Sequence, residues 1–110
     1  MIIEVPHAED ILLTMLDLEA FKKFTFWSEH LILHTRKSLE AFVMEAGMKV
    51  QSIQGIQRYP LSNHLFWLKN EKPGGHMKWS ELDSEELHTA YANTLKRLNR
   101  TDTIMAIIEK

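Results

Sequence analysis

The sequence predicts a small α/β domain built on a three-stranded sheet. Three short runs rich in β-branched and apolar residues, at 2–5, 48–57 and 103–108, are typical of strands. Between these runs, apolar residues recur at the three- and four-residue spacing of amphipathic helices. Three strands are too few to bury both faces of a sheet well, so we expect an open sheet edge.

The first strand is expected over Ile2 to Val5. Pro6 ends it, because proline has no N–H group to donate to a sheet ladder. Apolar residues at helical spacing then predict one helix or two between Glu9 and about Phe24. If there are two helices, the break falls at Asp17 to Glu19.

The next segment contains two short apolar stretches and one helix. The stretches 24–27 and 31–33 are too short to distinguish a strand from a buried loop. Thr35 is a good N-cap, and Gly47 suits the left-handed residue that follows a helix, so a helix is expected between them. Its apolar face consists of Leu39, Phe42, Val43 and Ala46.

The second strand is expected within Met48 to Gln57, where apolar and polar residues mix as in a strand near a sheet edge. Ser62 or Asn63 is expected to cap a short helix that reaches Leu68. The segment from Lys69 to Gly75 ends in Pro-Gly-Gly, so we expect a loop there.

The last third of the chain predicts one helix and one strand. Asp83 and Glu86 form a capping-box-like pair before a strongly periodic helix that ends at Asn99 or Arg100. Thr103 to Ile108 is apolar on both faces, which is typical of an interior strand.

The length and composition of the chain indicate a single domain over residues 1–110. The net charge of the chain indicates which classes of ligand it binds. The chain is 45% hydrophobic and 25% charged, as in globular proteins that bury a core. The net charge of −2 provides no basic field for a phosphate backbone, so small or neutral ligands are expected rather than nucleic acid. The absence of cysteine excludes disulfides and thiolate metal sites.

The N-terminus and the apolar runs indicate where the protein works. No apolar run approaches the ~18 residues of a membrane span, and no basic segment precedes a long apolar stretch as in a secretory signal. We therefore expect a cytoplasmic protein that does not enter membranes. A strand that starts at the very first residue normally has a neighbour upstream, which predicts that the chain is a piece of a longer protein.

A series of short motifs resembles the C-terminal half of a class I S-adenosylmethionine-dependent methyltransferase. Val5-Pro6, His30-Leu31-Ile32-Leu33, Thr35 and Ala46-Gly47-Met48 follow one another in the family's order. The resemblance implies an incomplete Rossmann-like methyltransferase fold, whose three strands resemble the family's fifth, sixth and seventh. It also implies that the last strand is antiparallel and inserted between the other two.

The chain departs from the family in the part that would bind the cofactor. Neither Gly55 nor Gly74-Gly75 follows a strand and opens a helix, as the family's glycine-rich loop does. The resemblance therefore implies S-adenosylmethionine as the cofactor of a full-length protein, with the missing N-terminal half of the fold as partner. The chain alone is expected neither to bind this cofactor nor to be active.

The stretch Trp27-Ser28-Glu29-His30 resembles a Tyr-His-Glu-His stretch of sugar C-methyltransferases, in which Glu29 and His30 match residue for residue. The resemblance implies proton transfer by His30, with Glu29 orienting or polarising it, on a small-molecule, sugar-type substrate. A histidine suits this role because its pKa lies near working pH. The alternative is that His30 bonds a backbone group and braces the loop.

A second group of candidates lies where the second strand ends, because loops at strand ends in α/β folds commonly gather ligands. Arg58 is suited to a phosphate or a carboxylate. The alternative is a turn in which Asn63 caps a helix and Arg58 pairs with a surface carboxylate. The expected substrate-binding residues are His7, Trp27, Arg58, Tyr59, Asn63 and His64. For His7, the alternative is a solvated loop histidine.

Two further possibilities follow from the sequence. His30 and His34 have a spacing that can hold a metal, but no third ligand is evident nearby, so no metal site is predicted. The alternative to a methyltransferase fragment is a non-catalytic α/β binding or dimerisation module. In that case the exposed edge at Ile2 to Val5 pairs with a second copy, giving a homodimer.

Overall fold

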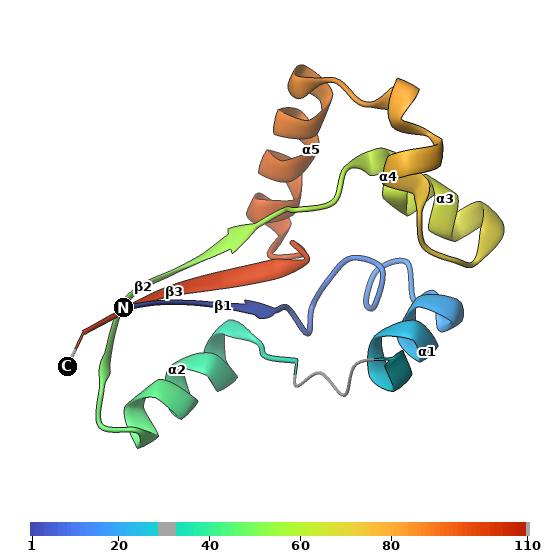
Figure 1. Cartoon of the computed structure of the whole chain (residues 1–110). Coiled ribbons are helices and arrows are strands. Elements are labelled where there is room, and N and C mark those ends of the chain that lie inside the picture. The colour runs from blue at the N-terminus through green and yellow to red at the C-terminus, as the bar shows by residue number, and fades with distance from the viewer. Residues whose placement is uncertain (29–32, 110) are drawn as a thin grey trace.

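The structure is a computed structural model that describes residues 1–28 and 33–109 of the chain. Strands β1 (Ile2–Pro6), β2 (Lys49–Ile56) and β3 (Thr103–Glu109) form one sheet in the order β1-β3-β2 (Figure 1). β3 runs antiparallel to both neighbours, so β1 and β2 are parallel and their carboxyl ends lie at the same end of the sheet. The predicted interior strand, inserted between the other two, is confirmed.

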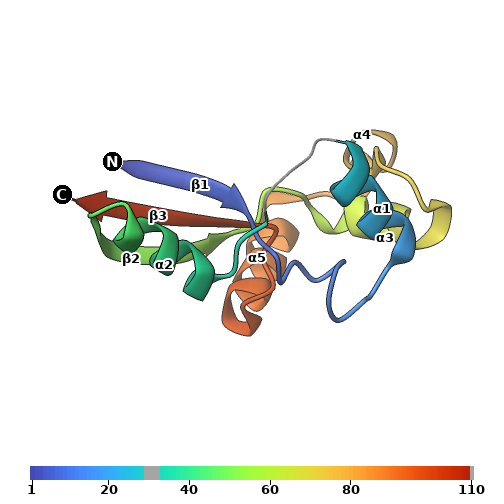
Figure 2. The same cartoon turned by 90° about the horizontal axis from the view of Figure 1, so that it is seen from below.

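Five α-helices and one 3-10 helix accompany this sheet in the described residues. They are α1 (Glu19–Ser28), α2 (Arg36–Glu45), α3 (Leu61–Asn70), α4 (Gly75–Lys78), η1 (Ser80–Leu82) and α5 (Glu85–Leu98). α2 lies against the sheet, whereas α1, α3 and α4 are grouped beyond the carboxyl ends of β1 and β2 (Figures 1 and 2). None of the described helices is long and apolar enough to cross a membrane.

The main core lies between α2 and one face of the sheet. Ile104, Ala106 and Ile108 alternate along β3 and pack against Leu39 and Val43 of α2. These side chains are almost fully buried, because β3 has a strand on each side and a helix above. The expected apolar face of α2 is only partly used. Phe42 is 59% exposed and Ala46 is exposed as well.

Both predicted ends of α2 are confirmed. The Thr35 hydroxyl accepts a hydrogen bond from the backbone N–H of Ser38 at 3.0 Å, and the Ser38 hydroxyl accepts one from Thr35 at 2.9 Å. This reciprocal pair satisfies two N–H groups that the helix itself cannot use. Gly47 has a φ of +81°, a left-handed conformation that suits glycine after a helix.

The helix predicted from Glu9 is wrong in its first half. Residues 11–15 form turns, and α1 begins only at Glu19. The Asp10 carboxylate accepts the backbone N–H of Leu12 at 2.8 Å, which offers the chain an alternative to a helix. Asp17 then takes a φ of +45°, which a right-handed helix cannot include. Residues 24–27 belong to α1, so they form neither a strand nor a loop.

Two predicted caps are also wrong. α3 begins at Leu61, so Ser62 and Asn63 lie inside its first turn, and the N-cap of α5 is Ser84 rather than Asp83. Ser62 instead donates to the Asp83 carboxylate at 3.0 Å, which links α3 to the segment before α5. The predicted loop from 69 to 75 is shorter than expected, because α3 continues to Asn70 and a short α4 begins at Gly75.

Truncating a buried side chain of β3 should be costly. We expect Ile104→Ala to lower the free energy of unfolding by about 2–5 kcal/mol, because Ile104 is fully buried and its loss leaves a cavity. Urea denaturation followed by circular dichroism measures this change. The matched control is Ile2→Ala, at a side chain that is 62% exposed, and its cost should stay within about 0.5 kcal/mol. Equal costs for the two variants would contradict this description of the core.

Candidate functional site

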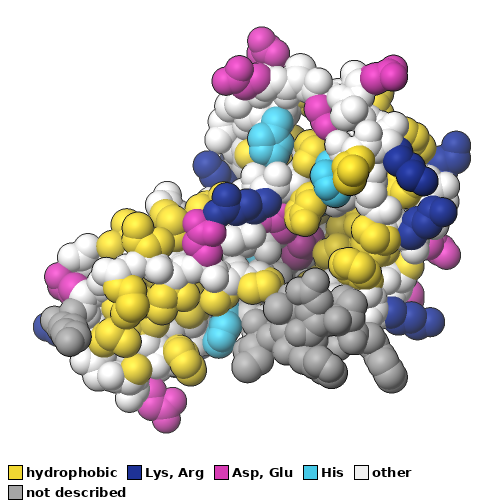
Figure 3. All heavy atoms as spheres, in the orientation of Figure 1, with side chains coloured by type: hydrophobic (Ala, Val, Ile, Leu, Met, Phe, Trp, Pro, Cys, Tyr) yellow, Lys and Arg dark blue, Asp and Glu magenta, His cyan; other side chains and the backbone are white. Residues whose placement is uncertain are grey.

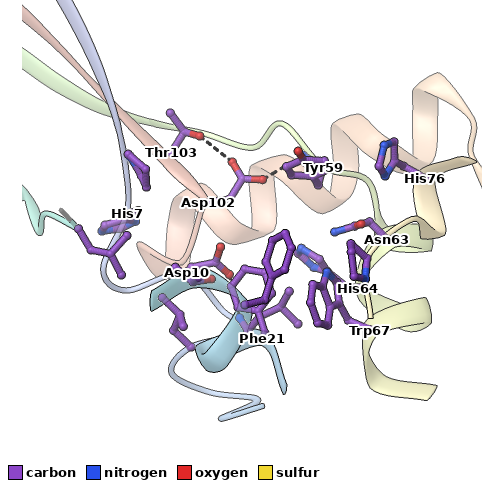
Figure 4. Close-up of a pocket in the computed structure, with 17 residues that line it drawn as sticks. His7, Asp10, Phe21, Tyr59, Asn63, His64, Trp67, His76, Asp102 and Thr103 are labelled. Atoms are coloured by element: carbon purple, nitrogen blue, oxygen red, sulfur yellow. Dashed lines mark hydrogen bonds between the residues drawn. The ribbon is translucent and has the colours of Figure 1, made fainter. Parts of the chain in front are cut away.

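A cavity of about 330 Å³ opens at the carboxyl ends of β1 and β2, beside α1 and α3 (Figure 4). Its lining includes Pro6 at the end of β1, Thr103 at the start of β3, and Tyr59 between β2 and α3. In α/β folds this end of the sheet is where ligands commonly bind. The volume suits a small organic molecule.

Four of the predicted substrate-binding residues line this cavity, namely His7, Tyr59, Asn63 and His64 (Figure 4). Arg58 does not line it. Its guanidinium pairs with the Glu4 carboxylate on β1, an ion pair of the kind that the alternative expected. The backbone of Trp27 belongs to α1, but its side chain, like all of Glu29 and His30, lies outside the described residues.

An aromatic cluster forms one wall of the cavity. Phe21 and Phe24 of α1 both pack edge-on against Trp67 of α3, with ring centroids 5.0 and 5.3 Å apart. Trp67 is almost fully buried. The sequence gives little sign that this cluster also borders a cavity, because aromatic residues at helical spacing are typical of any core.

Asp10 is a buried acid that sequence reasoning missed. It lies in the turn after β1, lines the cavity, and is only 5% exposed. Burial raises its pKa to about 7; the N–H of Leu12 lowers it and the nearby negative charge of Asp102 raises it further. The one sign of this turn in the sequence is an Asp two residues before a leucine, since an Asp side chain commonly bonds the backbone two residues on, in an Asx turn. This acid changes protonation near neutral pH.

Asp102, the residue before β3, is a second acid that the sequence analysis does not identify. It holds in place the rim of the cavity opposite Asp10. Its carboxylate accepts the backbone N–H groups of Arg58 and Tyr59, each at 3.0 Å, and the amide of Gln57 at 2.9 Å. The hydroxyl of Thr103 donates to it as well, at 2.9 Å. Burial raises the pKa of Asp102, and these hydrogen bonds act in the opposite direction. The network holds Tyr59, half exposed, at the cavity.

His64 lies inside the cavity wall on α3, where it contacts Tyr91 of α5. Its Nδ1 and the Tyr91 hydroxyl form a hydrogen bond. Burial lowers the pKa of His64 to about 4 and raises the pKa of Tyr91 well above its usual range. Both groups are therefore uncharged at neutral pH.

His7 is buried rather than solvated, which excludes the alternative considered for it. Its Nδ1 lies 2.9 Å from the backbone carbonyl of Thr101. A carbonyl oxygen only accepts, so Nδ1 carries the proton and Nε2 is left as an acceptor. Burial lowers the pKa of His7, and the ring is neutral in this tautomer.

The described residues provide neither a metal cluster nor the family's cofactor loop. No group of three or more acidic or histidine side chains in this part of the chain could hold a metal ion. His34 contacts the Ser38 hydroxyl at 3.1 Å, and its proposed partner His30 lies outside the described residues. Gly55 lies within β2, Gly74 precedes α4 and Gly75 is its first residue, and the element before them is the helix α3, so none of them connects a strand to a following helix as that loop requires.

Comparison with protein-family models, with characterised proteins and with solved structures finds no match to this chain. The site must therefore be interpreted from its own chemistry. It combines a small cavity, an aromatic wall, neutral imidazoles and an acid that ionises near pH 7. Such a site can bind a small organic molecule and exchange a proton with it.

The raised pKa of Asp10 predicts a specific pH dependence of stability. A carboxyl whose pKa is higher in the folded state than in the unfolded chain stabilises the fold at low pH. This stabilisation is lost as the pH rises from about 4 to above 7. Asp10→Asn removes this titration. The free energy of unfolding of the variant, relative to the wild type, should therefore rise by about 4 kcal/mol between pH 4 and pH 8.

Urea denaturation at several pH values measures this difference. Other titrating groups, including His64 and Asp102, are present in both proteins and cancel in the comparison. Asp17→Asn is the matched control, because Asp17 is exposed and asparagine tolerates its positive φ. A difference between Asp10→Asn and wild type that does not change with pH would show that Asp10 is not a buried, high-pKa acid.

The hydrogen bonds of Asp102 predict a second stability effect. Asp102→Asn replaces one acceptor oxygen with an N–H₂ group that faces other donors. We expect the free energy of unfolding to fall by about 2–4 kcal/mol. Glu4→Gln removes an acid whose ion pair with Arg58 is partly exposed, and its cost should stay below about 1 kcal/mol. Denaturation at a single pH compares the two, and an equal cost would contradict the role assigned to Asp102.

Proposed function

We propose that this chain is the substrate-side part of an S-adenosylmethionine-dependent methyltransferase that acts on a small molecule. One observation carries the proposal. The residues that the sequence puts forward for substrate binding at two separate places, His7 on one side and Tyr59, Asn63 and His64 on the other, line one cavity. That cavity lies at the end of the sheet where α/β enzymes bind their ligands.

The arrangement of strands also supports the proposal. The motifs that resemble the methyltransferase family implied a last strand inserted antiparallel between two parallel ones. The sheet has this order, β1-β3-β2, and β1 ends in Val5-Pro6. On this proposal the domain is an incomplete Rossmann-like methyltransferase fold that works in the cytoplasm.

The proposal divides the work between two parts of a longer protein. The missing N-terminal half would hold S-adenosylmethionine and supply the methyl group, because the described glycines form no cofactor loop. This chain would bind and orient the substrate. Glu29 and His30 stay in the proposal as proton-transfer residues on the resemblance of their stretch to sugar C-methyltransferases. The sugar-type substrate rests on the match of these two residues.

Two experiments test the proposal, a titration of this chain with S-adenosylmethionine and an examination of the longer protein. By calorimetry, the 110-residue chain alone should give no binding, because the loop that would cradle the cofactor is absent from its sequence. The coding sequence upstream of Met1 should then contain a strand, a glycine-rich loop and a helix. The joined protein should bind the cofactor and transfer a labelled methyl group to a component of a small-molecule extract.

Micromolar binding of S-adenosylmethionine to the isolated chain would contradict the proposal, since the site would then be built differently. So would an unrelated upstream sequence, particularly together with a dimer in sedimentation equilibrium. That combination would favour the second candidate function, a binding or dimerisation module. One observation supports this candidate: β1 lies at the sheet edge, and its Ile2 side chain is 62% exposed.

A further inference from the structure

We propose that the cavity beside α1 and α3 binds the ammonium group of a small organic cation, with Asp10 as its counter-ion. The inference rests on the proposed function in one respect, because it takes the cavity to be the substrate site. It adds the chemical class of that substrate, an amine. An amine carried on a sugar would satisfy both this inference and the proposed sugar-type substrate.

The charges around the cavity favour a cation. Its described lining contains two acids, Asp10 and Asp102, and neither lysine nor arginine. Of the three lining histidines, His7 and His64 are kept neutral by burial, which lowers both pKa values, and His76 is exposed on α4 beside Tyr59. Arg58, which could have recognised an anion, is paired with Glu4 outside the lining. Figure 3 shows acidic side chains within a hollow bordered by apolar ones.

Asp10 is the acid with an oxygen to spare. One of its oxygens, Oδ1, accepts the Leu12 N–H, and Oδ2 has no hydrogen-bond partner among the described residues. Both oxygens of Asp102 are already engaged by several donors, so it contributes negative charge rather than contact. A carboxylate buried without a cation is costly, and a bound ammonium group offsets that cost.

The aromatic wall suits the rest of such a ligand. Phe21 and Trp67 line the side formed by α1 and α3, and Tyr59 lies half exposed at the rim (Figure 4). Ammonium groups with alkyl substituents are attracted to the faces of aromatic rings and bury their carbon against them. The cavity therefore offers a negative charge and apolar contact at once.

The groups near Asp10 set how binding depends on pH. His7 and Glu9 lie on its own segment, Asp102 comes from the start of β3, and His64 and Tyr91 come from α3 and α5. Two arginines lie near His7: Arg100 is 3.7 Å from Glu9, and Arg36 donates to Asn99 and to the Ile53 carbonyl. With His7, His64 and Tyr91 neutral, Asp10 is the buried lining group whose charge changes near pH 7, and exposed His76 of α4 is a further titratable group in the lining. Binding of a cation should therefore strengthen as the pH rises.

Two probes of the same shape test the inference on the 110-residue chain without any cofactor. Choline carries a permanent positive charge, and 3,3-dimethylbutan-1-ol replaces its nitrogen by carbon. Nuclear magnetic resonance titration at pH 8 should show choline binding at least about tenfold more tightly than the alcohol. Choline affinity should fall about tenfold between pH 8 and pH 6, as Asp10 takes up a proton.

Variants assign the effect to Asp10. Asp10→Asn should abolish the preference for choline, whereas Asp17→Asn, which removes the same charge from an exposed turn, should keep it. A nitrogen–proton correlation spectrum shows whether each variant is folded, and the comparison of probes on the wild type stands without either variant. Equal binding of the two probes, no choline binding, or binding of inorganic phosphate instead would overturn the inference. Methyl transfer by the joined protein tests the proposed function separately, so either can fail alone.

Discussion

One partly buried aspartate, Asp102, connects all three strands at the end of the sheet that carries the cavity. The Asp102 carboxylate accepts hydrogen bonds from the segment that follows β2, and its backbone carbonyl accepts the N–H of His7 just after β1. Its own N–H bonds to the side chain of Gln57 at 2.9 Å. Because these contacts join segments far apart in sequence, they fix where the two rims of the cavity lie relative to each other.

The pKa values of the groups in the cavity follow from the burial of their side chains. Imidazoles that are removed from water stay neutral, and carboxyls in the same place become weaker acids. The cavity therefore contains groups that titrate outside their usual ranges, and Asp10 is brought to the pH at which proteins work. Perturbed acids in a cavity at the strand ends are typical of sites that bind or transform ligands.

The parts of the fold that the sequence predicted depend on local chemistry. The capped helix after Thr35 follows from residues three positions apart, and the interior position of β3 follows from apolar side chains on both faces. Asp10 and Asp102 could not be recognised in this way, because the burial of Asp10 and the hydrogen-bond partners of Asp102 are set by the tertiary structure. Asp102 and Gln57, for example, are separated by 45 residues. The same applies to Asp83, whose partner Ser62 displaced it from the expected cap.

The order of the strands has a consequence for how the protein is made. Each of the first two strands pairs with β3 in the sheet, and β3 follows both of them in the chain. On the ribosome, β1 and β2 therefore lack this shared partner until β3 has emerged. Unpaired strand edges of nascent chains associate readily with other chains. The sheet, and with it the cavity at its end, can therefore form only after β3 has been synthesised.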